Sequence, residues 1–408
     1  MSKLKDYRNL PLPNRGYINN FGQDTFTKNL ISLILTANLI YTVGRYSREI
    51  VAGGNPYLTG DWLINYEGGY NGRGLFGQAL LWFSDTFSLN LLWTAYTFQT
   101  GLYFIYFLFV ISIFRRIANP FVWMIALSPS FVMFDFLDTG GAFRKEILGF
   151  ASLILIVQLI IRKTFRNTLI FLSILFFIIF LFSWDAAFCF IPFYIYTFSK
   201  LYYKEVITRK SFHTFCIVFF VLGLTSIMRA VYFLYHRPAS ISEGICKSLT
   251  DRGLSPKICG GTIGSITGLD ANPVNMIHTL IFDYHFELYF VLLLLGLVPF
   301  FLNGWLRSNI VFIILLFISI VPLFVIGADY GRWIHIFGTF VTLAWLIDDT
   351  RPAFSRLLPV PRTFISTGTL KFLIFSVSFT NTWRIPVIWG SPADSFLGTF
   401  GRILSWFT

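Results

Sequence analysis

Residues 90–113 read NLLWTAYTFQTGLYFIYFLFVISI, a run without a single charged side chain. A helix needs roughly 20 apolar residues to cross a bilayer core, so this run is long enough to do so. Comparable runs recur along the chain. They predict about eleven spans, near residues 28–45, 90–113, 119–136, 147–161, 168–183, 186–199, 212–233, 284–302, 309–327, 334–347 and 370–388. The expected fold class is all-α, a polytopic transmembrane helical bundle that forms a single integral membrane domain over residues 1–408.

The composition favours the same class. Hydrophobic residues make up 55% of the chain and charged residues only 13%, whereas soluble domains carry about 25% charged residues. In lipid, backbone polar groups must be satisfied within the segment, which favours helices. The polar residues 1–27 lack the features of a cleavable signal peptide. The shorter apolar stretch 75–88 reads as a re-entrant or interfacial helix, and the tail 395–408 as an interfacial one.

The net charge of +12 indicates an orientation. In a soluble protein such a charge would suggest nucleic acid, but here the positive-inside rule explains it, so no nucleic-acid partner is expected. Basic residues cluster in loops that fall on one side if the spans alternate, for example Arg115 with Arg116 and Arg162 with Lys163. We therefore expect residues 1–27 to be cytoplasmic, and residues 46–89 and 234–283 to form a first and a long extracytoplasmic loop.

The outward segments carry acids and arginines beside span ends. Four of them read GDWLINYEGGYNGRGL (60–75), FDFLDTGGAFRKE (134–146), SWDAA (183–187) and GADYGRW (327–333). Charged groups at membrane depth are costly, and they usually pair, line a cavity or mark a substrate path. Arginine bonds phosphate in a fixed fork, and a nearby acid can act as a general base. The candidates for base catalysis are Asp61, Glu67 and Asp329; those for substrate binding are Arg73, Arg144, Arg332, Asp138, Asp185, Tyr70 and Tyr330.

Each candidate also has a structural explanation. Asp61 and Glu67 can cap helices or pair with Arg73. Asp329 and Arg332 are three residues apart, a spacing that suits a local ion pair. The remaining candidates have similar alternatives: an interfacial anchor for Arg144 with Lys145 and Glu146, a surface turn for Asp185, and a membrane-interface belt for the aromatic residues.

The four cysteines suggest one disulfide. Cys246 and Cys259 share the long loop, and a bond between them is expected if that loop is periplasmic. Cys189 and Cys216 lie in predicted spans and are expected to be packing residues. The five histidines show no metal-ligand spacing, so no metal site is predicted.

The stretch GDWLINYEGGYNGRG, an acid-bearing first outward loop, resembles that of the GT-C membrane glycosyltransferases. The span architecture, with outward arginines and one larger outward loop, resembles bacterial surface-polysaccharide polymerases, including O-antigen polymerases. Such a polymerase moves a growing glycan from a polyprenyl pyrophosphate, such as undecaprenyl pyrophosphate, onto a new lipid-linked repeat unit. The resemblance implies that Arg73, Arg144 and Arg332 hold the leaving pyrophosphate, while Asp61 or Glu67 serves as base.

The same resemblance implies the setting of the protein. It places the chain in the bacterial inner membrane, as a multi-pass protein with a periplasmic active face. The implied partners are lipid-linked oligosaccharide donor and acceptor, the bilayer, and other polysaccharide-assembly membrane proteins. No cofactor is implied; a divalent metal ion is compatible with this chemistry but not required. The first loop lacks the DxD motif that GT-C enzymes often show, which leaves the identity of the base open.

Other functions stay open on the sequence. A transferase of single sugars from polyprenyl phosphate would use the same groups. A flippase or transporter of lipid-linked glycans would also need charged groups in the membrane, although the spans show no two matching halves and the acids gather on one face. A non-catalytic partner of a polysaccharide complex would not need so many polar groups in short outward loops.

Overall fold

The computed structural model describes residues 25–117, 121–138, 140–162, 166–236, 238, 240–266, 286–326, 329–348 and 369–386. Every regular element within these ranges is a helix, which confirms the all-α expectation. The α-helices are α1 (Thr25–Val51), α2 (Leu58–Leu63), α3 (Leu75–Phe87), α4 (Leu91–Phe114), α5 (Val122–Ala126), α6 (Phe134–Leu137), α7 (Glu146–Arg162), α8 (Arg166–Ser183), α9 (Ile191–Tyr203), α10 (Arg209–His236), α11 (Ile241–Asp251), α13 (Phe286–Leu302), α14 (Trp305–Ser308), α15 (Ile310–Ile326), α16 (Tyr330–Asp348) and α18 (Thr369–Asn381). Three 3₁₀ turns accompany them: η3 (Asp185–Phe190), η4 (Pro256–Gly260) and η5 (Gly264–Ile266).

Three of these helices are long and apolar enough to cross a membrane: α4, α8 and the Arg209–Phe233 part of α10. Shorter apolar helices cover Glu146–Leu159, Glu287–Leu302 and Ile310–Phe324. The expected count of about eleven spans is therefore not confirmed. Large apolar side chains point away from the bundle, for example Ile217 and Phe220 of α10, and such a surface suits lipid better than water.

The predicted span 119–136 is not one helix. Within residues 121–138 the chain forms α5 and α6, separated by a non-helical stretch around Pro129. Proline lacks a backbone N–H and disfavours helical geometry at the preceding residue, so the helix is interrupted there. Ser128 Oγ lies 2.9 Å from Ser130 Oγ, and both residues are buried. The segment is enclosed by the bundle instead of lining its surface.

Other boundaries differ less. The predicted span 186–199 begins as η3 and becomes α9 only at Ile191, where Pro192 starts the helix without losing a needed N–H. The stretch expected as a re-entrant or interfacial helix at 75–88 is α3. Most of the predicted cytoplasmic segment 1–27 and the whole tail 395–408 lie outside the described residues.

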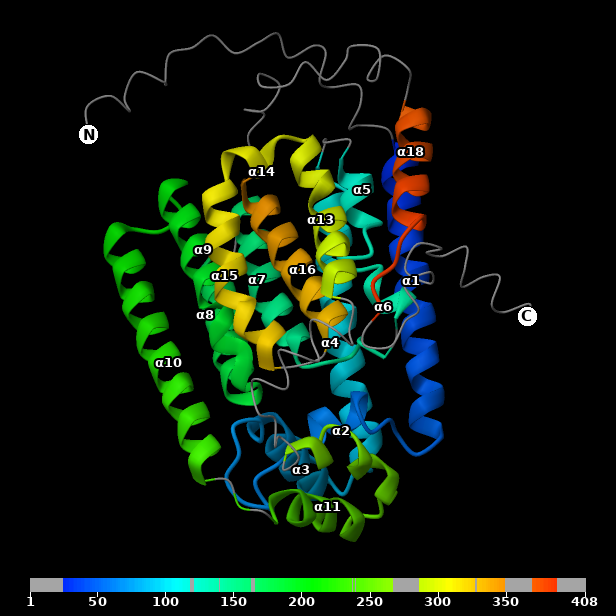
Figure 1. Ribbon diagram of the computed structural model, residues 1–408, viewed down its shortest axis with the longest axis vertical. Helices are drawn as coiled ribbons and strands as arrows, with labels where there is room; N and C mark the ends of the chain where they lie inside the picture. The colour runs from blue at the N-terminus through cyan, green and yellow to red at the C-terminus, as the bar shows by residue number, and fades with distance from the viewer. Residues whose placement is uncertain are drawn as a thin grey trace.

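The bundle is built around two buried helices. In Figure 1, α7 and α16 lie among the other long helices, and α7 packs against α8, α4 and α16. Every residue of α16 from Tyr330 to Ile347 is buried. At one end of the bundle Asp348 fixes α16, because its carboxylate binds Lys200 of α9 at 2.8 Å and Trp305 of α14 at 3.0 Å.

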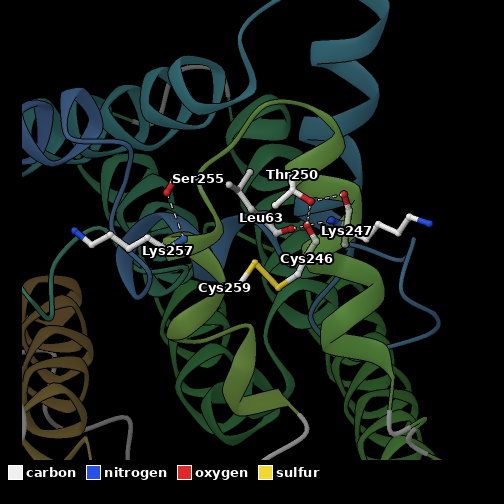
Figure 2. Close-up of a disulfide and its surroundings, with 8 residues drawn as sticks. Leu63, Cys246, Lys247, Thr250, Ser255, Lys257 and Cys259 are labelled. Carbon is white, nitrogen blue, oxygen red and sulfur yellow. Dashed lines mark hydrogen bonds between the residues drawn. A yellow bond between two sulfur atoms is a disulfide. The ribbon is translucent and has the colours of Figure 1, made fainter.

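The other end of the bundle carries a cap formed by α2, α3 and residues 240–266, which lie together in Figure 1. The backbones pack closely, since a Cβ on Gly244 would lie 2.6 Å from the Cα of Gly68. Figure 2 shows the disulfide between Cys246 and Cys259 that joins α11 to η4, with their Cα atoms 5.8 Å apart. The described residues 240–266 of the expected long loop thus lie at the same end of the molecule as α2 and α3 of the expected first loop, and residues 267–283 lie outside the described residues.

The disulfide can be tested by thiol counting. We expect membranes denatured in excess maleimide without reductant to carry the label on Cys189 and Cys216 only, because disulfide sulfurs do not react. Reduction before labelling should add Cys246 and Cys259, and mass spectrometry of the peptides measures both states. Maleimide on Cys246 in the unreduced sample would contradict the bond.

Candidate functional site

Charged side chains from five parts of the chain gather where the cap meets the bundle. They come from α2, the loop before α3, the turn before α7 together with its first residue, η3, and the start of α16. We call this group the charged cluster; its members are Asp61, Arg73, Arg144, Lys145, Glu146, Asp185, Asp329 and Arg332. It unites six of the residues singled out in the sequence with two that were not.

Arg332 is at the centre of the cluster. One guanidinium nitrogen hydrogen-bonds the carboxylate of Glu146, and another lies 2.9 Å from Asp329 Oδ2. Asp329 also approaches Arg144, with a nitrogen–oxygen distance of 3.8 Å. Arg332 and Glu146 are only 6% and 3% exposed. Breaking such a buried pair by removing one partner costs roughly 3–5 kcal/mol, so this contact ties α16 to α7.

Besides Glu146, the cluster contains a second buried carboxylate, that of Asp61. It is 2% exposed, and its Oδ2 atom makes no hydrogen bond to the described residues. Burial alone would raise the pKa of Asp61, but the charges of Lys145, Arg144, Arg332 and Arg73 outweigh burial and lower it. The carboxylate therefore stays ionised at neutral pH, with one oxygen able to accept a proton or a hydrogen bond.

Lys145 is a buried cation of the same cluster. Its side chain is fully buried, and Nζ donates a hydrogen bond of 2.9 Å to the carbonyl of Arg73. Burial lowers the pKa of Lys145 to about 8, although the neighbouring Asp61 opposes that shift. An ammonium group with this pKa can hold or release its proton near neutral pH.

Arg73 and Asp185 form a partly exposed rim of the cluster. Arg73 Nε lies 3.6 Å from Asp185 Oδ2, and their side chains are 32% and 24% exposed. Residue 72 is tightly confined, because a Cβ there would lie 1.6 Å from Asp185 Oδ1 and the carboxylate would have to move. Arg229 of α10 fixes the same loop by donating to the carbonyl of Gly72 at 2.7 Å and to the hydroxyl of Tyr70 at 3.0 Å.

A left-handed turn at Phe143 delivers the next three residues to the cluster. Its φ of +54° costs a non-glycine residue about 1–2 kcal/mol. The carbonyl of Phe143 accepts hydrogen bonds from Trp62 Nε1 at 2.6 Å and Gln99 Nε2 at 3.1 Å. Net contributions of about 1 kcal/mol per hydrogen bond are enough to offset that strain. Arg144 then reaches back to the cap, where it bonds the carbonyl of Tyr57 and the hydroxyl of Thr262.

Four of the sequence candidates lie outside the cluster. Glu67 binds Arg252 at 2.9 Å, and Arg252 also binds Asp85 at 2.8 Å in an exposed ion network of the cap. These hydrogen bonds from Arg252 lower the pKa of Glu67. The other three have different neighbours: Asp138 accepts from the amide of Gly140, Tyr70 stacks on Tyr66, and Tyr330 packs between Tyr289 and Phe324.

The sequence did not identify Lys145 and Glu146 as site residues. Charges at the start of an apolar helix are equally typical of an interfacial anchor, and only tertiary contacts distinguish the two roles. Arg229 had a clearer signal, since it is an arginine within an otherwise apolar helix.

Metal ligation and similarity to known proteins add two observations. Among the residues that the structure describes, no group of three His, Cys, Asp or Glu side chains could hold a metal ion. Comparisons with protein-family models, curated proteins and solved structures find no match to this chain.

The buried pair can be tested by double substitution. Arg332→Met should lower the free energy of unfolding by roughly 3–5 kcal/mol, because it leaves Glu146 buried without its partner. Adding Glu146→Leu removes that unpaired charge and should recover most of the loss. Denaturation in mixed detergent micelles measures both effects.

The control for this pair is Arg252→Met, which breaks the exposed ion network of the cap. Exposed pairs contribute only about 0–1 kcal/mol, so this variant should unfold nearly like the parent chain. Equal losses for Arg332→Met and Arg252→Met, or no recovery in the double variant, would contradict the buried pairing.

Proposed function

We propose that this chain is a membrane glycosyltransferase that uses polyprenyl-(pyro)phosphate-linked sugars and polymerises O-antigen or exopolysaccharide repeat units. One observation carries the proposal: Arg73, Arg144, Lys145 and Arg332 converge on the ionised Asp61 at one end of a bundle with membrane-length apolar helices. Such a substrate has an apolar tail for lipid, an anionic phosphate for the arginines and a sugar for the aqueous side.

The basic residues are suited to a leaving pyrophosphate. Arginine presents several N–H donors in a planar fork, which matches phosphate oxygens. The Nε atoms of Arg144 and Arg332 are buried and make no hydrogen bond to the described residues. Arg73 is the most accessible of the three, so a phosphate would meet it first at the rim. In a buried site each such contact is stronger than it would be in water.

In the proposed reaction Asp61 is the general base. Its carboxylate takes the proton of the acceptor hydroxyl while the hydroxyl oxygen attacks the anomeric carbon of the donor sugar. The bond between that carbon and the phosphate oxygen breaks, and its electrons leave with the lipid pyrophosphate. Arg73, Arg332 and the Lys145 ammonium offset the charge that develops on the leaving group. Asp329 lies between Arg332 and Arg144 and serves to hold them, while Glu67 has no part in this scheme.

The proposal includes a location and an orientation. The chain would be a multi-pass protein of the bacterial inner membrane with a GT-C-like architecture and a cytoplasmic N-terminus. The cap would face the periplasm, an oxidising compartment that allows the disulfide of Cys246 and Cys259. Its partners would be the lipid-linked donor and acceptor, together with other membrane proteins of polysaccharide assembly.

A second candidate is a flippase of lipid-linked glycans. The enclosure of the cluster favours it, because Asp61 is 2% exposed and the Lys145 side chain is fully buried, as in an occluded carrier. A flippase moves the substrate without forming a glycosidic bond, so the products of the two activities differ.

The base can be identified in cells that lack the gene and carry a plasmid copy. We expect wild type and Glu67→Gln to give a ladder of surface-polysaccharide lengths on a gel, and Asp61→Asn to give a single repeat unit. The asparagine keeps the size of Asp61 but cannot accept the proton. A ladder from Asp61→Asn would contradict the base assignment. If Asp61→Asn gives neither a ladder nor a single repeat unit, that result would favour the flippase.

The charge of Lys145 predicts a pH dependence. With a pKa of about 8, the ammonium that offsets the leaving group is present below that pH and lost above it. Polymerisation in proteoliposomes, with a polyprenyl-pyrophosphate oligosaccharide as substrate, should therefore fall as the pH rises through about 8. Lys145→Arg keeps its charge at every such pH and should remove the alkaline fall. Identical pH profiles for the two proteins would refute the role of Lys145.

A further inference from the structure

The amide group of Phe143 is hydrogen-bonded, like its carbonyl. Its N–H donates a hydrogen bond of 2.8 Å to the hydroxyl of Tyr103 on α4. The Tyr103 side chain is buried, at 4% exposure. Side chains from separate elements therefore hold both backbone polar groups of one residue.

Tyr103 contacts both the backbone and the ring of Phe143. A tyrosine hydroxyl has lone pairs to accept with, and one of them accepts from the Phe143 N–H. The ring centroid of Phe143 lies 4.4 Å from those of both Tyr46 and Tyr103. The ring of Phe143 is therefore held between two tyrosines while its amide is bonded to one of them.

The conformation that these contacts hold is one that phenylalanine rarely adopts. A bulky residue at positive φ is an outlier and persists only where its surroundings impose it. The residues that follow Phe143 are Arg144, Lys145 and Glu146. A relaxed φ at Phe143 would therefore turn the chain away from Asp61 and Arg332.

We propose that Tyr103 is a positioning residue that locks the left-handed turn at Phe143 and so aims Lys145 and Glu146 into the charged cluster. Tyr103 does not touch the substrate in this scheme. The consequence for turnover rests on the proposed function, whereas the effect on the turn does not.

The chain supplies a matched control for Tyr103→Phe. Tyr106 lies one helical turn further along α4 and is equally buried, and its hydroxyl makes no hydrogen bond to the described residues. Tyr103→Phe and Tyr106→Phe remove the same atom from the same helix. Only the first removes a hydrogen bond to the Phe143 amide.

The test follows the turn itself, in the full chain in liposomes. Loss of one hydrogen bond should speed amide exchange of Phe143 by roughly tenfold in Tyr103→Phe, with no change in Tyr106→Phe. At a pH above both labelling midpoints, an amine-reactive reagent should label Lys145 faster by a similar factor because the side chain is more accessible. The pH midpoint of that labelling should itself rise from about 8 towards the ordinary 10.5 as the ammonium becomes solvated. Equal behaviour of the two variants would overturn the proposal.

The same measurements separate the positioning role of Tyr103 from the proposed function. Changed labelling in a chain that makes no polymer would refute the proposed function alone, and unchanged labelling in an active chain would refute the positioning role alone.

Discussion

The pairing of Arg332 with Glu146 and Asp329 is the interaction on which the rest of the site depends. It joins the first turn of α16 to the first turn of α7 within a buried environment. Leaving either charge buried without the other would be costly, so the pair favours the meeting of the two helices in this register. Arg144 and Lys145 precede Glu146 in the chain, and this contact therefore also brings them to Asp61.

The exposure of the cluster is graded. The Lys145 side chain is fully buried, while Arg73 and Asp185 are partly exposed at the rim. Charges in the buried part interact strongly because little water screens them, and those at the rim remain accessible to an anion from outside. A substrate that brings a phosphate to Arg73 and a hydroxyl to Asp61 would use both properties. The cap covers Arg144, since Thr262 and the carbonyl of Tyr57 contact it directly.

Sequence patterns were sufficient for the helices that face the surface of the bundle. The uncharged run 90–113 corresponds to α4 (Leu91–Phe114), because a helix of that length and composition has few alternatives. Sequence patterns were insufficient at residues 119–136. The described part of that stretch is apolar and buried, but it is not one helix because it is interrupted around Pro129. Hydropathy shows only that a segment avoids water. A segment buried in protein and a segment exposed to lipid both avoid water, so hydropathy does not distinguish them.

The candidate site, too, could be predicted only in part from the sequence. Outward acids and arginines could be listed from the sequence, but Asp61 and Glu67 occupy one short loop and have the same chemistry. Only packing separates them: Asp61 is enclosed by the start of α7, and Glu67 points to Arg252 on the cap. Phe143 had no sequence signal at all, since its left-handed conformation is imposed by Trp62, Gln99 and Tyr103 from elsewhere in the chain.

Convergence of distant segments on one end of the bundle is tested most directly by cysteine cross-linking in native membranes. A Cβ at residue 72 would overlap the Asp185 carboxylate, which Asp185→Cys removes, so Gly72→Cys with Asp185→Cys should form a disulfide rapidly under mild oxidation. Ser211→Cys is the control partner, because it lies eighteen residues before Arg229 on α10, a distance of about 27 Å along the helix. The account predicts a bond between residues 72 and 185 and none between 72 and 211. Failure of the first pair to form, in a chain that is present in the membrane, would contradict it.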